Sequence, residues 1–172
     1  MRGSVPLVAG DVVRYPDLAR TLRQLAADGR DGFYRGRVAE QLVDGVRAAG
    51  GIWTLEDLAR YEVIERQPIR SSFQGMTIVS APPPSAGGVA LANVLQILSG
   101  YDLGRLAPAD RKHLTIEAMR RAYRDRAIYL GDPAFVTMPL ERLLSPYYAD
   151  CQRISILLDG ATPSIQLSGI LP

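Results

Sequence analysis

The stretch "SAPPPSAGGVALANVLQILSG", residues 80–100, decides the fold of the second half of the chain. It opens with three consecutive prolines, Pro82, Pro83 and Pro84. Proline fixes its own φ and pushes the preceding residue toward extended backbone, so these residues predict an extended exit from a strand. The glycines that follow, Gly87 and Gly88, allow a helix to pack close to its neighbour. The stretch therefore predicts a corner between a strand and a helix.

The run after the glycines predicts a buried helix over residues 89–98. Only Asn93 and Gln96 interrupt its apolar sequence, and a helix that is apolar on nearly every side is buried on nearly every side. Ser85 is placed to cap this helix. A glycine pair before a helix can also bind an anion through its N–H groups. However, no lysine follows and the spacing matches neither the phosphate-loop nor the dinucleotide fingerprint. We therefore favour a structural corner over an anion site.

A hairpin is predicted immediately before the prolines. Gln74–Gly75 separates two β-rich runs, residues 62–73 and 76–81, which is typical of two strands joined by a tight turn. Pro68 lies within the first run, so this strand should be an edge strand or an irregular one.

Short amphipathic helices are predicted in the first part of the chain. Apolar residues recur at helical spacing over residues 16–28 and again over residues 38–49. A shorter helix is predicted over residues 54–58, where Thr54 and Asp57 have the spacing of a capping box. This part of the chain should form a layer of helices.

The longest helix is predicted over roughly residues 110–130. Its apolar side chains fill one broad arc, and they are Leu114, Ala118, Met119, Ala122, Tyr123, Ala127, Tyr129 and Leu130. Glu117 and Arg121 form an i,i+4 pair outside that arc. Asp132, in the turn signal Gly131–Asp132–Pro133, is expected to end the helix, and short helical pieces follow over residues 139–144 and 146–153.

Arg126 falls near the middle of the apolar arc. Because a guanidinium keeps its charge when it is buried, Arg126 is predicted to be mostly buried and bonded to a carboxylate or several carbonyls. Asp125, Asp132 and Glu117 are all near enough in sequence to be the partner. The spacing does not choose among them.

Composition and charge exclude several classes of protein. Hydrophobic residues make up 47% of the 172 residues and charged residues 22%, as in a single globular domain. A formal net charge of +2 is too small to indicate binding to nucleic acid. No apolar run approaches the ~20 residues that a membrane span needs, and the start of the chain lacks the apolar region of a signal peptide.

Two residue types limit the chemistry further. The chain has one cysteine, Cys151, and one histidine, His113. This excludes an internal disulfide, a cysteine-based metal site and any two-histidine metal motif. The basic run over residues 110–126 also contains carboxylates, so we expect a solvated face rather than a nucleic-acid site.

Five motifs occur in the order seen in γ-glutamyltranspeptidases. They are "PDLARTLRQLAADGRDGFYRGRVAEQL" (16–42), "GGIWTLEDLARY" (50–61), "PPPSAGG" (82–88), "HLTIEAMRRAYRDRAIYLGDPAF" (113–135) and "ATPS" (161–164). The chain resembles the C-terminal part of the large subunit of these enzymes. We expect the family segment over residues 10–164, a leader or irregular start over 1–9 and an irregular tail over 165–172. The expected fold is α+β, a mostly helical segment with one β-hairpin, within an αββα N-terminal-nucleophile hydrolase.

The resemblance implies a specific chemistry outside this chain. In the family, a precursor cleaves itself and a threonine becomes the first residue of the small subunit, where its own α-amino group can act as the base. The enzyme moves the γ-glutamyl group of glutathione or related amides to water or an amino acid through an acyl-enzyme. The resemblance implies no metal or organic cofactor, and a periplasmic or extracellular location.

No catalytic or substrate-binding position of the family has a match in this sequence. The nucleophile and oxyanion glycines belong to the small subunit, and the carboxylate-binding arginine lies earlier in the large subunit. We therefore expect only structural roles for the residues singled out, which are Pro82, Pro83, Pro84, Gly87, Gly88, Asp125, Arg126 and Asp132.

The resemblance also implies the partners. They are the remainder of the large subunit and the small catalytic subunit, and the 172 residues alone should be inactive. An alternative is a non-catalytic helical interaction module derived from the enzyme. An enzyme segment should expose the 89–98 helix or the hairpin edge and self-associate, whereas a module should be monomeric. A third alternative is an acylase of the same superfamily, which differs only in residues outside this chain.

Overall fold

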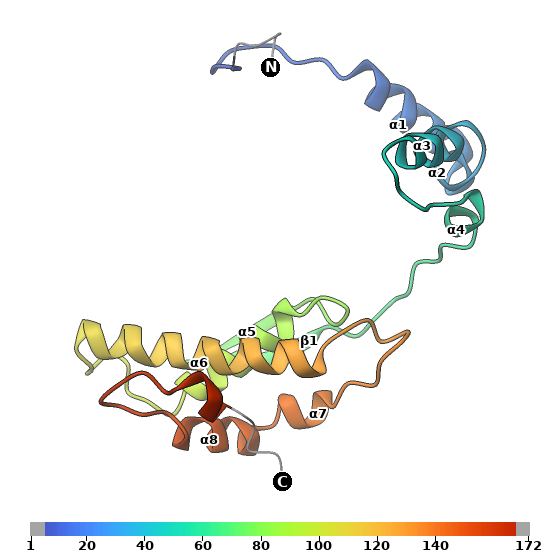
Figure 1. Cartoon of the computed structure of the whole chain (residues 1–172). Coiled ribbons are helices and arrows are strands. Elements are labelled where there is room, and N and C mark those ends of the chain that lie inside the picture. Colours follow the sequence, from blue (N-terminus) through green and yellow to red (C-terminus); the bar gives the residue numbers. More distant parts are fainter. Residues whose placement is uncertain (1–5, 168–172) are drawn as a thin grey trace. The chain divides into compact units, whose positions relative to one another are not determined.

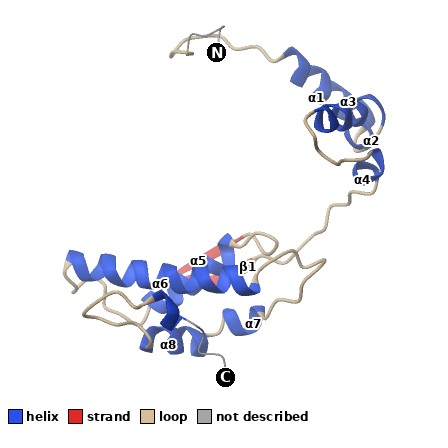
Figure 2. Cartoon of the chain, in the orientation of Figure 1, coloured by secondary structure: helices blue, strands red, loops and turns tan. Residues whose placement is uncertain are grey.

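The computed structural model describes residues 6–167, and the chain divides into two compact units between Ile64 and Glu65 (Figure 1). Helices dominate both units, and strands occur only as one pair in the second unit of the described chain (Figure 2). The predicted α+β class with a single hairpin is confirmed. Parts of the predicted leader and tail, residues 1–5 and 168–172, lie outside the described residues.

The first unit is a group of four helices. They are α1 (Pro16–Asp28), α2 (Asp31–Tyr34), α3 (Gly36–Ala48) and α4 (Leu55–Ala59). Thr54 and Asp57 form the predicted capping box at the start of α4. Arg30 ties α2 to the end of α4, since its Nη2 donates to the carbonyl of Ala59 at 2.8 Å. Burial is slight in this unit, and α1 has no buried residue.

The hairpin opens the second unit. Strands β1 (Ile69–Phe73) and β2 (Met76–Ser80) pair antiparallel, with Phe73 opposite Met76. The turn residues Gln74 and Gly75 have φ of 49° and 79°, which is the left-handed region that a type I′ turn requires at both positions. The predicted hairpin is confirmed, although β1 starts only after Pro68.

The corner after β2 is a tight turn. The N–H of Ser85 donates to the carbonyl of Pro82 at 3.1 Å, so the predicted extended path through the prolines is wrong. The φ that proline imposes suits a turn as well as an extended chain. Ser85 does not cap the helix either, because the cap position is Ala86 and no side chain caps it.

Four helices and a short 3₁₀ turn complete the described part of the second unit. They are α5 (Gly87–Leu98), α6 (Pro108–Tyr129), α7 (Leu140–Leu143), α8 (Pro146–Ile154) and the 3₁₀ turn Ser164–Leu167. Helix α5 contacts β1, α6 and α8, in line with the predicted buried helix. The main apolar cluster consists of Ile97, Leu98, Leu114, Ala118, Ala149 and Ile156.

Gly88 lies where α5 approaches the end of β2. A Cβ atom at this position would lie 2.4 Å from the carbonyl oxygen of Ala81 and 3.1 Å from the Cβ of Ser80. The neighbouring Gly87 has only the Ser85 hydroxyl within reach, at 3.8 Å. Close packing of helix and strand therefore depends on Gly88, whereas Gly87 has room for a side chain.

The buried face of helix α6 overlaps the predicted one only in part. Its buried residues are Leu114, Glu117, Ala118, Arg121, Ala122 and Asp125. Arg126 is exposed and has no side-chain hydrogen bond or ion pair to any other described residue, so its predicted burial is wrong. The Glu117–Arg121 pair, predicted outside the buried arc, lies inside it. The apolar arc was too broad to define the buried side, because three of its eight side chains are exposed.

None of the helices within residues 6–167 combines the length and the apolar character that a membrane span requires.

Candidate functional site

Two buried carboxylates on α6 form the candidate site of the second unit. Glu117 is 1% exposed and Asp125 is 3% exposed, although carboxylates are rarely buried without partners. They lie eight residues apart on the same side of the helix, which is just over two turns. Each carboxylate accepts hydrogen bonds from other elements, so together they join α6 to α5, α8 and the segment that follows α8.

Glu117 is held by two arginines and a backbone amide. Its Oε2 lies 2.6 Å from Nη1 of Arg121, and its Oε1 lies 2.5 Å from Nη1 of Arg120. The N–H of Thr162 also donates to Oε1 at 3.2 Å. Thr162 is itself buried, so both oxygens of the carboxylate have partners in the interior.

Arg121 uses its remaining donors on the segment after α8. Its Nε donates to the hydroxyl of Ser155 at 2.9 Å, and its Nη2 donates to the Ser155 carbonyl at 2.6 Å. Nη2 also lies 3.3 Å from the Thr162 hydroxyl. We call Glu117, Arg121, Ser155 and Thr162 the α6 clamp. The clamp fixes both ends of residues 155–162 against α6.

The clamp keeps Glu117 ionised. Burial alone would raise the pKa of this carboxyl, but the hydrogen bonds from Thr162, Arg121 and Arg120 outweigh burial and lower the pKa to about 2. A group with this pKa cannot act as a general acid near neutral pH. Glu117 is therefore ionised near neutral pH.

Asp125 is the centre of a second network. Its Oδ1 accepts the hydroxyl of Tyr148 at 3.1 Å, and its Oδ2 accepts the amide of Gln152 at 2.6 Å. The amide of Asn93 lies 3.3 Å from Oδ2, and Arg124 lies 3.3 Å from Oδ1. Asp125 thus links α6 to α5 through Asn93 and to α8 through Tyr148 and Gln152.

Burial has the largest effect on the pKa values of Asp125 and Tyr148 in this second network. It raises the pKa of Asp125 even though Tyr148, Gln152 and Asn93 donate hydrogen bonds that favour the carboxylate. Burial and the adjacent Asp125 charge raise the pKa of Tyr148 to about 12. Within the described residues, the hydrogen bonds of the Asp125 and Tyr148 side chains involve no serine, threonine or cysteine that could be activated, so the network favours a structural role.

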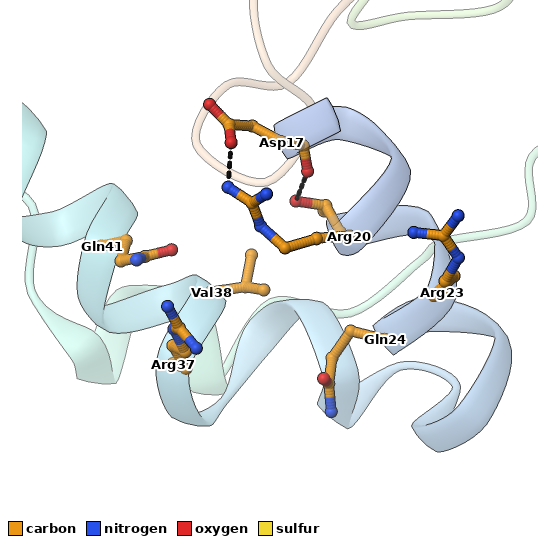
Figure 3. Close-up of a pocket in the computed structure, with 8 residues that line it drawn as sticks. Asp17, Arg20, Arg23, Gln24, Arg37, Val38 and Gln41 are labelled. Carbon is orange, nitrogen blue, oxygen red and sulfur yellow. Dashed lines mark hydrogen bonds and ion pairs between the residues drawn. The ribbon is translucent and has the colours of Figure 1, made fainter. Parts of the chain in front are cut away.

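The first unit contains a polar cavity of about 500 Å³ between α1 and α3 (Figure 3). Its lining residues are Asp17, Arg20, Thr21, Arg23, Gln24, Arg37, Val38 and Gln41. Arg20 bonds to Asp17 within the lining (Figure 3). The lining side chains are exposed or half-buried, and they include no nucleophile–base pair. The cavity is a groove on the helical layer.

The side chains that commonly bind metal ions are dispersed in the described part of the chain. Over residues 6–167, no three side chains of His, Cys, Asp or Glu are grouped to hold a metal ion. His113 lies 2.7 Å from the carbonyl of Leu157, and Cys151 is a half-buried free thiol.

A comparison with protein families decides the identity of the fold. The family model for γ-glutamyltranspeptidase matches residues 1–169. The chain belongs to the γ-glutamyltranspeptidase family. The resemblance carried by the five motifs is thereby confirmed, and the α+β segment is part of an N-terminal-nucleophile hydrolase fold.

Individual relatives agree with this assignment. The chain is 47% identical over 158 residues to a glutathione hydrolase proenzyme from Pseudomonas sp. (strain A14), a match that covers 91% of this chain and 28% of the relative. It is 41% identical over 161 residues to an acylase ACY 1 proenzyme from Pseudomonas sp. (strain SE83), covering 92% and 29%. The crystal structure of Helicobacter pylori γ-glutamyltranspeptidase superposes with a TM-score of 0.86 at 40% identity, covering 96% of this chain and 48% of that one.

The chain therefore spans less than a third of the length of the curated relatives it matches. Those relatives are proenzymes in which the matched segment is the smaller part. The helices, the hairpin and the two buried networks described above are features of that segment of a γ-glutamyltranspeptidase-family protein.

The residues singled out from the sequence do not form one cluster. Asp125 is the centre of a buried network, whereas Arg126, the next residue, is exposed. Asp132 is exposed in the turn after α6, where its Oδ1 accepts the N–H of Ala134 at 2.9 Å. The three prolines and two glycines lie at the corner between β2 and α5. Their structural roles remain predictions.

Sequence reasoning missed most of the residues that form the two networks. They are Asn93, Arg121, Tyr148, Gln152, Ser155 and Thr162. One signal was present, because Leu114, Ala118 and Ala122 share a face with Glu117 and Arg121 at i,i+3 and i,i+4 spacing. The partners come from distant segments, and no local pattern identifies them.

Proposed function

We propose that this chain is the scaffold segment of an enzyme that transfers or hydrolyses the γ-glutamyl group of glutathione and related amides through an acyl-enzyme. The observation that carries the proposal is the match to the γ-glutamyltranspeptidase model over residues 1–169. The buried networks support it, because Glu117 and Asp125 are bonded to partners that join α6 to neighbouring segments of the fold. The 172 residues on their own are then inactive.

In this proposal the chain positions the rest of the enzyme. The α6 clamp and the Asp125 network hold α5, α6 and α8 as one packed group. The nucleophilic threonine that the resemblance implies lies in the small subunit, and the carboxylate-binding arginine lies earlier in the large subunit. The partners are therefore those two parts, and no step of the reaction passes through a residue described here.

A second candidate function is amide hydrolysis by a related acylase. The 41% identity to the acylase ACY 1 proenzyme is close to the identity with the glutathione hydrolase. In this proposal the residues that select the amide lie outside the chain, so the scaffold serves either reaction. The non-catalytic interaction module is the third candidate, and it requires that the segment cannot support activity in an enzyme.

A chimera tests the proposal. This chain replaces the matching segment of the Pseudomonas sp. (strain A14) glutathione hydrolase, and the release of p-nitroaniline from γ-glutamyl-p-nitroanilide is measured. We expect an active chimera and no release above a blank from the 172-residue chain alone. An inactive chimera that is folded and soluble contradicts the scaffold function and favours the interaction module. Activity of the chain alone contradicts the proposal directly.

A further inference from the structure

The cavity of about 500 Å³ in the first unit lies between polar faces of α1 and α3 (Figure 3). Asp17, Arg20, Thr21 and Gln24 line it from α1. Because these residues are three or four positions apart, they share one face of that helix. We call this cavity the α1–α3 groove. Its volume is typical of sites that bind small molecules, and its polar lining favours a charged ligand over an apolar one.

Two arginines of the α1–α3 groove have no carboxylate partner. Arg20 is paired with Asp17. In contrast, Arg23 on α1 and Arg37 on α3 form no ion pair or hydrogen bond through their side chains with another residue of the described range 6–167. Asp17 is the only carboxylate among the described lining residues, so the groove carries two uncompensated positive charges. Guanidinium groups bind anions through charge-assisted hydrogen bonds.

The positions of the two arginines indicate what kind of anion fits. They belong to different helices, and Figure 3 shows their side chains apart from each other, with Val38 and Gln24 between them in this view. This arrangement favours a ligand with two separated anionic groups over one compact anion. A carboxylate balances the single charge of a guanidinium and accepts two parallel N–H groups from it. Gln41 also lines the groove, and its amide has no other described partner.

We propose that the α1–α3 groove binds a small dicarboxylate, with one carboxylate on Arg23 and the other on Arg37. The inference goes beyond the proposed function, because it assigns a ligand to the first unit and does not involve the buried networks of α6. It accounts for two unpaired guanidinium groups on the two walls of one cavity. Arginines that are merely solvated would show no preference for a ligand with two carboxylates.

The unmodified 172-residue chain provides the first test. Isothermal titration calorimetry measures the binding of straight-chain dicarboxylates from succinate to suberate, each beside its monoamide, which has the same length and only one charge. We expect the best dicarboxylate to bind at least about tenfold more tightly than its monoamide, because one charge-assisted contact is lost with the second carboxylate. It should also bind more tightly than inorganic phosphate. The proposal is overturned if no dicarboxylate exceeds its monoamide, or if phosphate binds best.

Four variants locate the binding site. R23Q and R37Q should each weaken the binding of the best dicarboxylate at least about tenfold. R14Q is the matched control, since Arg14 is exposed, has no side-chain partner among the described residues and does not line the groove. D17N removes the carboxylate that repels an anion and releases Arg20, so it should tighten binding several-fold.

The control decides between a site and general charge attraction. Equal losses in R14Q, R23Q and R37Q would show that the ligand responds only to net charge, and they would overturn the proposal. Both groove variants remove exposed side chains without a described partner, so their Tm should equal that of the unmodified chain. If either variant unfolds early, D17N still decides, because unchanged or weaker binding in D17N contradicts the placement of the ligand.

Discussion

Burying Glu117 with Arg121 removes two charges from water, and among the described residues Glu117 is the only acidic side chain that pairs with Arg121. The side chains are 1% and 3% exposed, so solvent does not screen them. The attraction between the charges and the bonds to Ser155 and Thr162 offset the loss of hydration. Removing Glu117 leaves the Arg121 charge buried and unpaired, and removing Arg121 leaves Oε2 of Glu117 without its charged partner while Oε1 keeps Arg120.

Arg121→Ala should therefore destabilise the second unit by about 3–5 kcal/mol. Cys151, a half-buried thiol on α8, reports unfolding of this unit through its alkylation across a urea series. Arg105→Ala is the matched control, and its effect should stay within about 0.5 kcal/mol because its pair is exposed. The double variant E117L/R121M should recover most of the loss, since no buried charge then remains. A mild effect of R121A contradicts the role of the α6 clamp.

Glu117 also predicts a loss of stability in acid. Its pKa is about 2 in the folded protein and 4.5 ordinarily, so the unfolded state takes up the proton first as pH falls. The stabilisation, about 3 kcal/mol, is complete above about pH 4.5 and is lost between there and pH 2. The raised pKa of Asp125 acts in the opposite direction, because the folded state then binds the proton more tightly.

The measurement compares the urea midpoint at pH 7 and at pH 3. The protein should lose stability between these values, and Glu117→Gln should remove most of the difference while starting from a lower midpoint at pH 7. Glu56→Gln changes an exposed pair on α4 and serves as the control. An unchanged pH dependence in E117Q assigns the acid sensitivity to other carboxyls.

At the scale of helices and strands, the sequence predicted correctly those features that depend on residues close together in the chain. The capping box at Thr54 and the turn at Gln74–Gly75 depend on residues within a few positions, and both are confirmed. Which side of α6 is buried depends instead on the segments that pack against the helix. Ala118 and Ala122 pack inward while Met119 and Tyr123 face solvent, so the hydrophobic pattern alone could not orient the helix.

The burial of the charged Glu117–Arg121 pair of α6 could not be predicted from the sequence for a related reason. Glu117 and Arg121 have the spacing of an ordinary surface pair, and only Ser155 and Thr162, more than thirty positions away, give them a buried environment. Sequence reasoning placed a buried arginine on this helix and chose the wrong one. Arg126 has apolar neighbours along the helix, but two of them, Tyr123 and Ala127, are themselves exposed.

The junction of α5 and β2 predicts a difference between two adjacent glycines. Gly88→Ala puts a methyl group 2.4 Å from the carbonyl oxygen of Ala81, which the backbone must move to accommodate, and we expect a loss of about 1–3 kcal/mol. Gly87→Ala meets nothing closer than 3.8 Å and should be close to neutral. Both are measured by the Cys151 urea assay. Equal effects would mean that close packing does not depend on Gly88.

For the whole molecule, the division into two units predicts where a protease cuts first. Residues 62–67 are exposed and lie outside every helix and strand, directly at the boundary between the units. Proteases need an accessible, extended segment, and Arg66 is the residue there that trypsin recognises. Limited trypsin digestion should therefore first release residues 1–66 and 67–172. Arg66→Gln should abolish this pair of products, whereas Arg105→Gln should not. A first cut inside α6 would show instead that the long helix opens more readily than the boundary, and the packing of the second unit around its two buried carboxylates argues against that outcome.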